Sequence, residues 1–193
     1  MGPRRQEEQM VVHLNDIPDR GLSLDLPLGV AWLRDALAGT PAEAGPAEAH
    51  VELTLTRSFG NVTVRGTLLG EVTYPCTRCG ASSALALNEG VRVTFVPHKN
   101  FADRDRTHAS NDEGLELTDE DLELATYLDQ TLDLEPAVRD QLVLALPMTH
   151  LCRADCQGLC GQCGADLNLE TCTCVRDDID PRWRALKGLK PNA

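Results

Sequence analysis

The chain has 193 residues, of which 42% are hydrophobic, so it can bury one substantial core without help from disulfides. Its 18 Lys and Arg residues against 30 Asp and Glu residues give a formal charge of -12, which disfavours sequence-independent binding to polyphosphate. The charged opening MGPRRQEEQ is unlike a signal peptide and no run of 18 apolar residues occurs, so we expect a cytoplasmic protein without a membrane partner.

The first long element in the chain is a helix predicted over residues 30–37, which ends at Gly39. The following stretch, TPAEAGPAEAH at residues 40–50, contains no bulky apolar residue. Segments of this composition are typical of mobile linkers, and we therefore expect a flexible segment between the helix and the strands that follow.

Strands begin at residue 51, where the spacing of the apolar residues changes to two. Apolar and polar residues alternate over residues 51–56 and 62–65, with a turn signal at Gly60-Asn61 between them. Strand character continues over residues 68–74, 82–87 and 91–95, and the sequence Asn-Glu-Gly indicates a second turn at residues 88–90. These segments predict four or five strands in an antiparallel meander.

Residues 97–118 are polar and lack apolar periodicity, so a second flexible segment is expected there. Helical spacing returns after residue 132 and stops at Pro147. The predicted fold class is α+β: an antiparallel β meander with a few helices forms a core domain over residues 1–150. A cysteine-rich zinc-binding module and a C-terminal helix complete the chain at residues 151–193.

The eight cysteines are the strongest chemical signal in the sequence. In a reducing compartment, cysteines in short-spaced pairs are typical of metal ligands. Eight thiolates divide into two tetrahedral four-thiolate sites, and both CxxC pairs are followed by a glycine, as suits a turn around a metal ion. We therefore predict two structural zinc ions. The candidate ligands are Cys76, Cys79, Cys152, Cys156, Cys160, Cys163, Cys172 and Cys174.

Four pairs of cysteines can combine into two sites in three ways. We favour a local site made from the last four cysteines, because only a short loop separates them and their segment has too little apolar content to fold without metal. The remaining four would then tie the strands to the end of the second helix. The favoured sets are Cys160, Cys163, Cys172 and Cys174, and Cys76, Cys79, Cys152 and Cys156.

Other roles for the cysteines stay open at this point. Iron also accepts four thiolates, and His150 could replace a cysteine as a ligand. A redox CxxC usually opens a helix, whereas Cys76 and Cys79 lie between two predicted strands. An all-cysteine set leaves no open position for a catalytic zinc, and the sequence contains no phosphate loop, GxSxG or HExxH. We therefore expect neither an enzyme nor a small-molecule substrate.

The segments YPCTRCG, LCRADCQGLCGQCGADLN and IDPRWRALKGL, together with a helix ending in LVLALPM, resemble the YceD family of large ribosomal RNA subunit accumulation proteins. The resemblance covers most of residues 11–190 and is most specific over residues 144–189. It implies a bacterial or organellar factor that supports 23S ribosomal RNA accumulation and large-subunit biogenesis, with metal and nucleic-acid binding. Besides the cysteines, the family's motif positions fall on Gly158, Leu159, Gly164, Leu167, Asn168, Asp180, Pro181 and Arg182.

Two kinds of partner fit this resemblance. Ribosomal RNA or a pre-50S particle would be bound by a basic C-terminal segment, in which an indole ring could stack on a base. The candidate RNA-binding residues are Arg176, Arg182, Trp183, Arg184 and Lys187. A basic ribosomal protein or assembly factor is the alternative; it would contact the acidic surface of the chain, and zinc would then be structural only.

Overall fold

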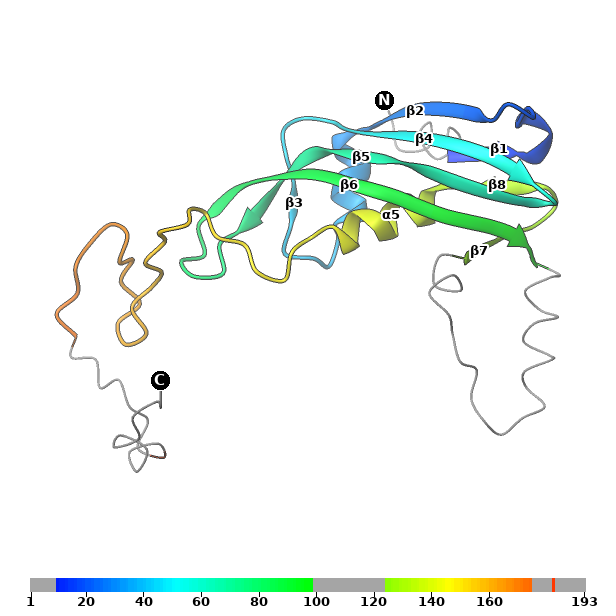
Figure 1. Ribbon diagram of the computed structural model, residues 1–193. Helices are drawn as coiled ribbons and strands as arrows, with labels where there is room; N and C mark the ends of the chain where they lie inside the picture. Colours follow the sequence, from blue (N-terminus) through cyan, green and yellow to red (C-terminus); the bar gives the residue numbers. More distant parts are fainter. Residues whose placement is uncertain (1–9, 99–123, 175–181, 183–193) are drawn as a thin grey trace, which may run out of the picture.

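A computed structural model of the protein describes residues 10–98, 124–174 and 182 (Figure 1). Within these residues, a sheet carries two α-helices on one face, and a cysteine-rich segment without regular secondary structure extends from one end. The strands are β1 (Val11–His13), β2 (Leu22–Leu28), β3 (Glu43–Ala44), β4 (Ala49–Ser58), β5 (Asn61–Pro75), β6 (Ser82–Pro97), β7 (Leu124–Tyr127) and β8 (Thr131–Asp133). The helices are η2 (Leu14–Asp16), α2 (Val30–Ala36) and α5 (Glu135–Leu144).

The main sheet has the strand order β2-β4-β5-β6-β7, with β3 paired to β5 at one end. Strands β2, β4, β5 and β6 are antiparallel neighbours, but β7 joins β6 in parallel. The sheet is therefore mixed rather than purely antiparallel as predicted. Strands β1 and β8 form a separate antiparallel pair. The predicted division at residue 150 stays a prediction, and most of the expected flexible segment at residues 97–118 lies outside the described residues.

One face of the sheet is covered by α2 and α5 (Figure 1). Alternate residues of the strands point into the core on this side, including Val51, Leu53 and Leu68, which are fully buried. The two helices contact each other through Arg139, whose guanidinium group lies 2.8 Å from carboxylate oxygens of both Asp35 and Glu135. The inner face therefore matches the predicted alternation, and both helices lie close to their predicted positions.

The β5–β6 hairpin is longer and more regular than the sequence indicated. Its strands contain 15 and 16 residues and remain paired from Val62 opposite Phe95 to Pro75 opposite Ser82. The turn expected at residues 88–90 is wrong, because these residues pair with residues 67–69 of β5 inside the ladder. Cross-strand pairing to β5 overrides the local turn preference of Asn and Gly.

The segment expected to be flexible at residues 40–50 contains buried residues and a short strand, and its flexibility stays a prediction. Ala42 and Ala49 are buried in the core, and β3 pairs with β5. At Gly45, an added Cβ would lie 2.7 Å from the carbonyl oxygen of Glu71. Small residues that look like linker composition therefore serve here to let two backbones approach closely.

We expect Gly66→Ala in β5 to destabilise the sheet. A Cβ at this position would lie 1.9 Å from the carbonyl oxygen of Glu52 on β4, so the strands must separate, at a cost of about 2 kcal/mol or more. Gly90→Ala in β6 is the matched control, because its Cβ would meet no atom within 4 Å. In urea unfolding, the free energy of unfolding should fall by about 2 kcal/mol or more for Gly66→Ala and change by no more than about 0.5 kcal/mol for Gly90→Ala. Equal losses would contradict this account of Gly66.

Candidate metal centres

The first cysteine pair lies at the tip of the β5–β6 hairpin, in the sequence Cys76-Thr-Arg-Cys79-Gly80-Ala81. The N–H of Cys76 donates to the carbonyl of Ala81 at 2.9 Å, and the N–H of Gly80 donates to the carbonyl of Cys76 at 2.9 Å. Gly80 has a φ of +74°, which a residue with a Cβ rarely adopts. These bonds curl the chain so that both thiols point to the same side of the tip.

The same backbone arrangement occurs a second time in the chain. In Cys160-Gly-Gln-Cys163-Gly164-Ala165, the N–H of Cys160 donates to the carbonyl of Ala165 at 2.8 Å. The N–H of Gly164 donates to the carbonyl of Cys160 at 2.9 Å, and φ of Gly164 is again +74°. The sequence signal is therefore CxxCGA rather than CxxC followed by glycine, and its two copies form the same turn.

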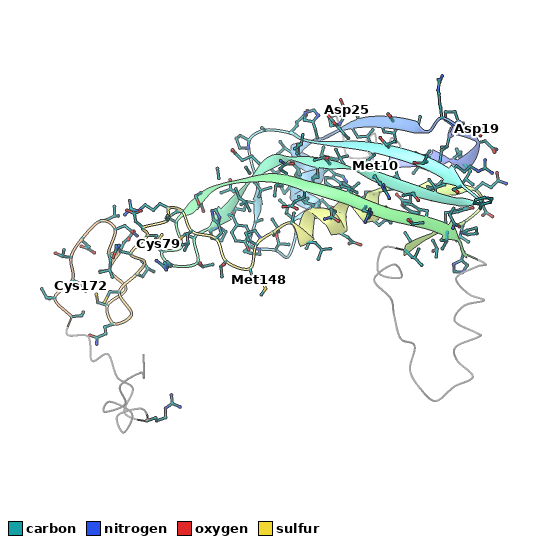
Figure 2. All side chains as sticks on the ribbon, in the orientation of Figure 1. Met10, Asp19, Asp25, Cys79, Met148 and Cys172 are labelled. Atoms are coloured by element: carbon teal, nitrogen blue, oxygen red, sulfur yellow. The ribbon has the colours of Figure 1, made fainter. Side chains whose placement is uncertain are left out.

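The structure gathers the eight cysteines into two groups of four, and within each group all the sulfur atoms lie within 4.8 Å of one another. We call Cys76, Cys79, Cys152 and Cys156 the hairpin site, and Cys160, Cys163, Cys172 and Cys174 the loop site. These are the two sets that the sequence analysis favoured. Figure 2 shows Cys79 and Cys172 at the same end of the molecule, remote from Asp19 at the opposite end.

The sulfur spacing fits a tetrahedral metal ion. Zinc–sulfur bonds of about 2.3 Å place the corners of a tetrahedron about 3.8 Å apart. In the hairpin site, the Cys76 and Cys156 sulfurs are 3.8 Å apart, and the Cys79 and Cys152 sulfurs are 3.7 Å apart. A disulfide would need about 2.05 Å, and all eight cysteines are free thiols. Both groups could hold a metal ion, and their donor set is the one that zinc or iron accepts.

Backbone hydrogen bonds hold the second cysteine pair of the hairpin site against the hairpin tip. The N–H of Thr77 donates to the carbonyl of His150 at 2.8 Å, and the N–H of Leu159 donates to the carbonyl of Arg78 at 3.1 Å. The Arg78 side chain donates from Nη1 to the carbonyl of Cys156 at 2.8 Å. Residues 150–159 therefore follow the hairpin tip closely on both sides of Cys152 and Cys156.

His150 anchors this segment and does not join either cysteine group. Its Nε2 lies 2.8 Å from Oγ of Ser83, and its ring packs edge-on against Tyr74 with the centroids 5.6 Å apart. The Tyr74 hydroxyl donates to the carbonyl of Pro147 at 2.9 Å. The alternative in which His150 replaces a cysteine ligand therefore does not match the structure, because four thiols already complete the hairpin site.

The electrostatic environment favours one thiolate in each site. Backbone amides of Cys152 and Cys79 lower the pKa of Cys76 to about 6, and those of Cys163 and Gln162 lower the pKa of Cys160 to about 6. Burial and the neighbouring thiols raise the pKa of Cys152 to about 12. The thiols of Cys76 and Cys160 are thus ready to bind a cation near neutral pH, whereas that of Cys152 would release a proton on binding it.

The candidate RNA-binding residues are almost entirely outside the part of the chain that the structure describes. Only Arg182 is described, and it is exposed. The basic surface expected for the C-terminal segment stays a prediction. Sequence reasoning also missed Asn168 as a contact to the hairpin site, because the hydrogen bonds of its side chain cannot be read from spacing.

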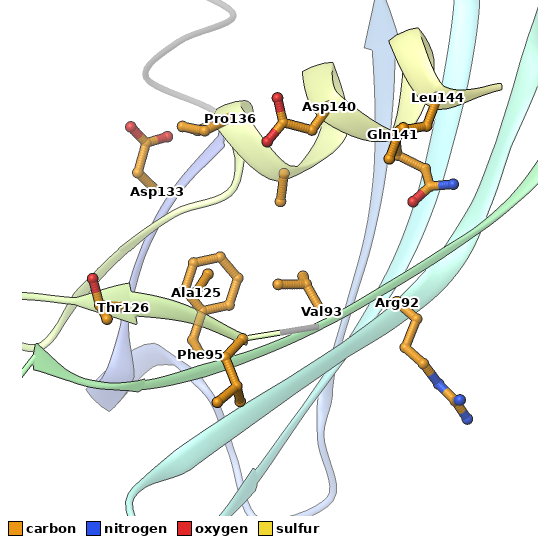
Figure 3. Close-up of a pocket in the computed structure, with 12 residues that line it drawn as sticks. Arg92, Val93, Phe95, Ala125, Thr126, Asp133, Pro136, Asp140, Gln141 and Leu144 are labelled. Atoms are coloured by element: carbon orange, nitrogen blue, oxygen red, sulfur yellow. The ribbon is translucent and has the colours of Figure 1, made fainter. Parts of the chain in front are cut away.

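A cavity of about 340 Å³ lies between α5 and strands β6 and β7 (Figure 3). Its floor is apolar and includes Val93, Phe95 and Ala125, while Asp133 and Asp140 lie near its α5 side. Among the described residues that line this cavity there is no histidine, cysteine, serine or lysine. Among the described residues, no helix is long and apolar enough to cross a membrane.

Residues 64–190 match the sequence model of the family described as large ribosomal RNA subunit accumulation protein YceD. The chain belongs to the YceD family. The matched range begins in β5 and includes all eight cysteines of the hairpin and loop sites. The family resemblance noted in the sequence is thereby confirmed.

Several relatives share this region. A Mycobacterium tuberculosis protein described as uncharacterized is 38% identical over 125 residues, covering 65% of this chain and 54% of that protein. The Arabidopsis thaliana relative, large ribosomal RNA subunit accumulation protein YCED homolog 1, chloroplastic, is 25% identical over 171 residues, covering 82% of this chain and 51% of its own. The chain thus spans about half the length of the curated relatives it matches. No solved structure matches it significantly.

We expect protein purified without added metal to contain two zinc ions per chain, measured by elemental analysis. Cys76→Ser and Cys172→Ser should each reduce this number to one, because the two substitutions affect different groups of sulfurs. Ser83→Ala, which removes a contact to His150 but no thiol, is the control and should retain both ions. Iron in place of zinc, or loss of both ions in each cysteine variant, would contradict two separate zinc sites.

Proposed function

We propose that this protein is a non-catalytic, zinc-binding factor that supports accumulation of large-subunit ribosomal RNA in the cytoplasm. The observation that carries the proposal is the pair of four-thiol groups at tetrahedral spacing, in a chain that belongs to the YceD family. The plant relatives' names refer to large ribosomal RNA subunit accumulation, and we extend that role to this chain.

Binding rather than catalysis is favoured by the chemistry of the two sites. Four thiolates complete the coordination of a zinc ion, and a catalytic zinc needs an open position for water or substrate. The zinc ions would thus hold the shape of the chain around Cys152–Cys174 rather than react.

For the direct partner we propose ribosomal RNA, bound through the segment that follows the loop site. Basic side chains and one indole ring occur together within residues 176–187. Such a group can neutralise phosphates and stack on an unpaired base, which suits recognition of single-stranded RNA. The segment begins two residues after Cys174, so the loop site would hold one end of it in place.

A basic ribosomal protein or assembly factor is the second candidate, and the charge of the chain favours it. The formal charge is -12, and two four-thiolate zinc sites would add about -4. Near the cysteines, Arg78 and Arg153 already make internal contacts, to the carbonyl of Cys156 and to Asn168. Met148 and Leu169 are highly exposed and would offer apolar contacts to a protein partner.

The RNA proposal predicts that a charge reversal in the C-terminal segment abolishes retention of 23S fragments. In an electrophoretic shift assay, Arg182→Glu, Arg184→Glu and Lys187→Glu together should reduce affinity at least about tenfold at fixed salt, because phosphate contacts are lost. The control carries the same change in net charge at exposed positions of the N-terminal half: Arg20→Glu, Arg57→Glu and Arg65→Glu.

Unchanged retention in the control together with loss in the test variant supports the RNA proposal. Equal loss in both would show that only total charge matters. No loss in either would overturn the proposed RNA surface and favour the basic protein partner.

The cellular role can be tested by complementation in a bacterial strain that lacks its own YceD protein. We expect this chain to restore the ratio of 23S to 16S ribosomal RNA, and the double variant Cys76→Ser, Cys172→Ser to fail, because both metal sites are disrupted. Thr171→Ala, an exposed position next to Cys172, is the control and should restore the ratio. A double variant as effective as the parent chain would show that the metal sites are dispensable for this role.

A further inference from the structure

The side chain of Asn168 uses its full hydrogen-bonding capacity between the two cysteine sites. Its Oδ1 accepts from the N–H of Gln157 at 2.8 Å and from Nη2 of Arg153 at 2.9 Å. Its Nδ2 donates to Oδ1 of Asp166 at 2.7 Å and to the sulfur of Cys156 at 3.5 Å. An amide has two acceptor positions and two N–H donors, and all four are occupied here.

Only one orientation of this amide satisfies its neighbours. Turned by 180°, the amide oxygen would face the carboxylate of Asp166, which accepts, and the sulfur of Cys156, which also accepts when it is a metal-bound thiolate. The NH₂ group would then face the donors of Gln157 and Arg153. The surroundings therefore fix an N–H toward Cys156, a ligand candidate of the hairpin site.

Asn168 itself belongs to the loop that connects the two cysteine pairs of the loop site. Residues around it are fixed independently: the N–H of Leu167 donates to the carbonyl of Gly158 at 3.0 Å. Asp166 accepts from the backbone N–H of Asn168 at 2.9 Å and pairs with Leu159 in a short β-bridge. The position of the amide therefore depends on the fold of the loop site, while its contact is made to the hairpin site.

We propose that Asn168 is a positioning residue that orients Cys156 and couples metal binding at the hairpin site to metal binding at the loop site. This inference rests on the proposed zinc binding. An N–H donated to a sulfur ligand fixes its direction and stabilises its negative charge, and loss of such outer contacts typically weakens metal affinity about 10- to 100-fold. Because coupling between two sites is reciprocal, each ion strengthens the binding of the other.

The first test measures the affinity of the hairpin site in Asn168→Ala and Asn168→Asp. The aspartate variant keeps the shape and the acceptor oxygen of the side chain but places a second carboxylate oxygen against Cys156 and Asp166. It therefore distinguishes the effect of losing the N–H donor from the effect of losing side-chain volume. Leu169→Asp adds the same charge at the next, exposed position and is the control. Protein loaded with cadmium-113 is titrated with EDTA while NMR follows one resonance for each site.

The resonance of the loop site is assigned as the one missing in Cys172→Ser. We expect both Asn168 variants to release cadmium from the hairpin site at about 10- to 100-fold lower EDTA concentration than the parent chain, with Leu169→Asp unchanged. Hairpin-site release that matches the parent in both Asn168 variants would overturn the positioning role. Circular dichroism of each loaded variant checks that the sheet is intact.

The second test is a cycle that measures the coupling. The loop site is emptied by Cys172→Ser with Cys174→Ser, once in the parent chain and once with Asn168→Ala. Emptying the loop site should lower the metal affinity of the hairpin site about tenfold in the parent chain, but no more than about twofold in the Asn168→Ala background. Equal weakening in both backgrounds would show that coupling does not pass through Asn168.

The two proposals fail in different ways. A parent chain that binds neither zinc nor cadmium with four-thiolate character would overturn the proposed zinc-binding function. A parent chain that holds two ions, with a hairpin site that is indifferent to Asn168, would overturn only the positioning role.

Discussion

Contact between the hairpin tip and residues 150–159 is the constraint on which the C-terminal part of the described structure depends. It brings the sulfurs of Cys76 and Cys156, 80 residues apart in sequence, to 3.8 Å. Bringing together two such distant points costs conformational entropy, which the hydrogen bonds of Thr77, Arg78 and Leu159 offset only in part. A metal ion shared by both segments would supply the remaining free energy.

The two ends of the molecule are stabilised by different means. The sheet and its helices bury a continuous set of aliphatic side chains, among them Leu33, Leu53 and Leu142. In residues 151–174, by contrast, the buried positions are Cys156, Gly158 and Cys160. A segment with no fully buried aliphatic side chain gains little from the hydrophobic effect, so backbone hydrogen bonds hold it, and the proposed metal ions would add to them.

The features that the sequence predicted correctly have local causes. The periodicity of α2 and α5 is visible within one segment, and the spacing of CxxC followed by glycine is contained in five residues. The errors arise where a distant strand decides the outcome. Residues 88–90 look like a turn until β5 lies beside them, and residues 40–50 have the composition of a linker although β3 pairs with β5 and Ala42 and Ala49 are buried. The parallel pairing of β7 likewise has no local signal.

The candidate site shows the same division. The cysteines and their grouping could be argued from spacing and loop length, since metal-binding turns are short and local. The contact of Asn168 with Cys156 could not, because it depends on where the loop of one site lies against the chain of the other. The proposed RNA surface is defined by sequence alone, since Arg182 is its only described member.

The unbroken pairing of β5 with β6 has a consequence for how the chain matures. A slip of one residue between these strands would turn the inner residues of β6 outward and would also separate the amide of Cys76 from the carbonyl of Ala81. The slipped hairpin would lack the turn around Cys76 and Cys79 and so would bind a metal ion poorly. Metal binding would therefore stabilise the correctly aligned hairpin and shift the population toward it.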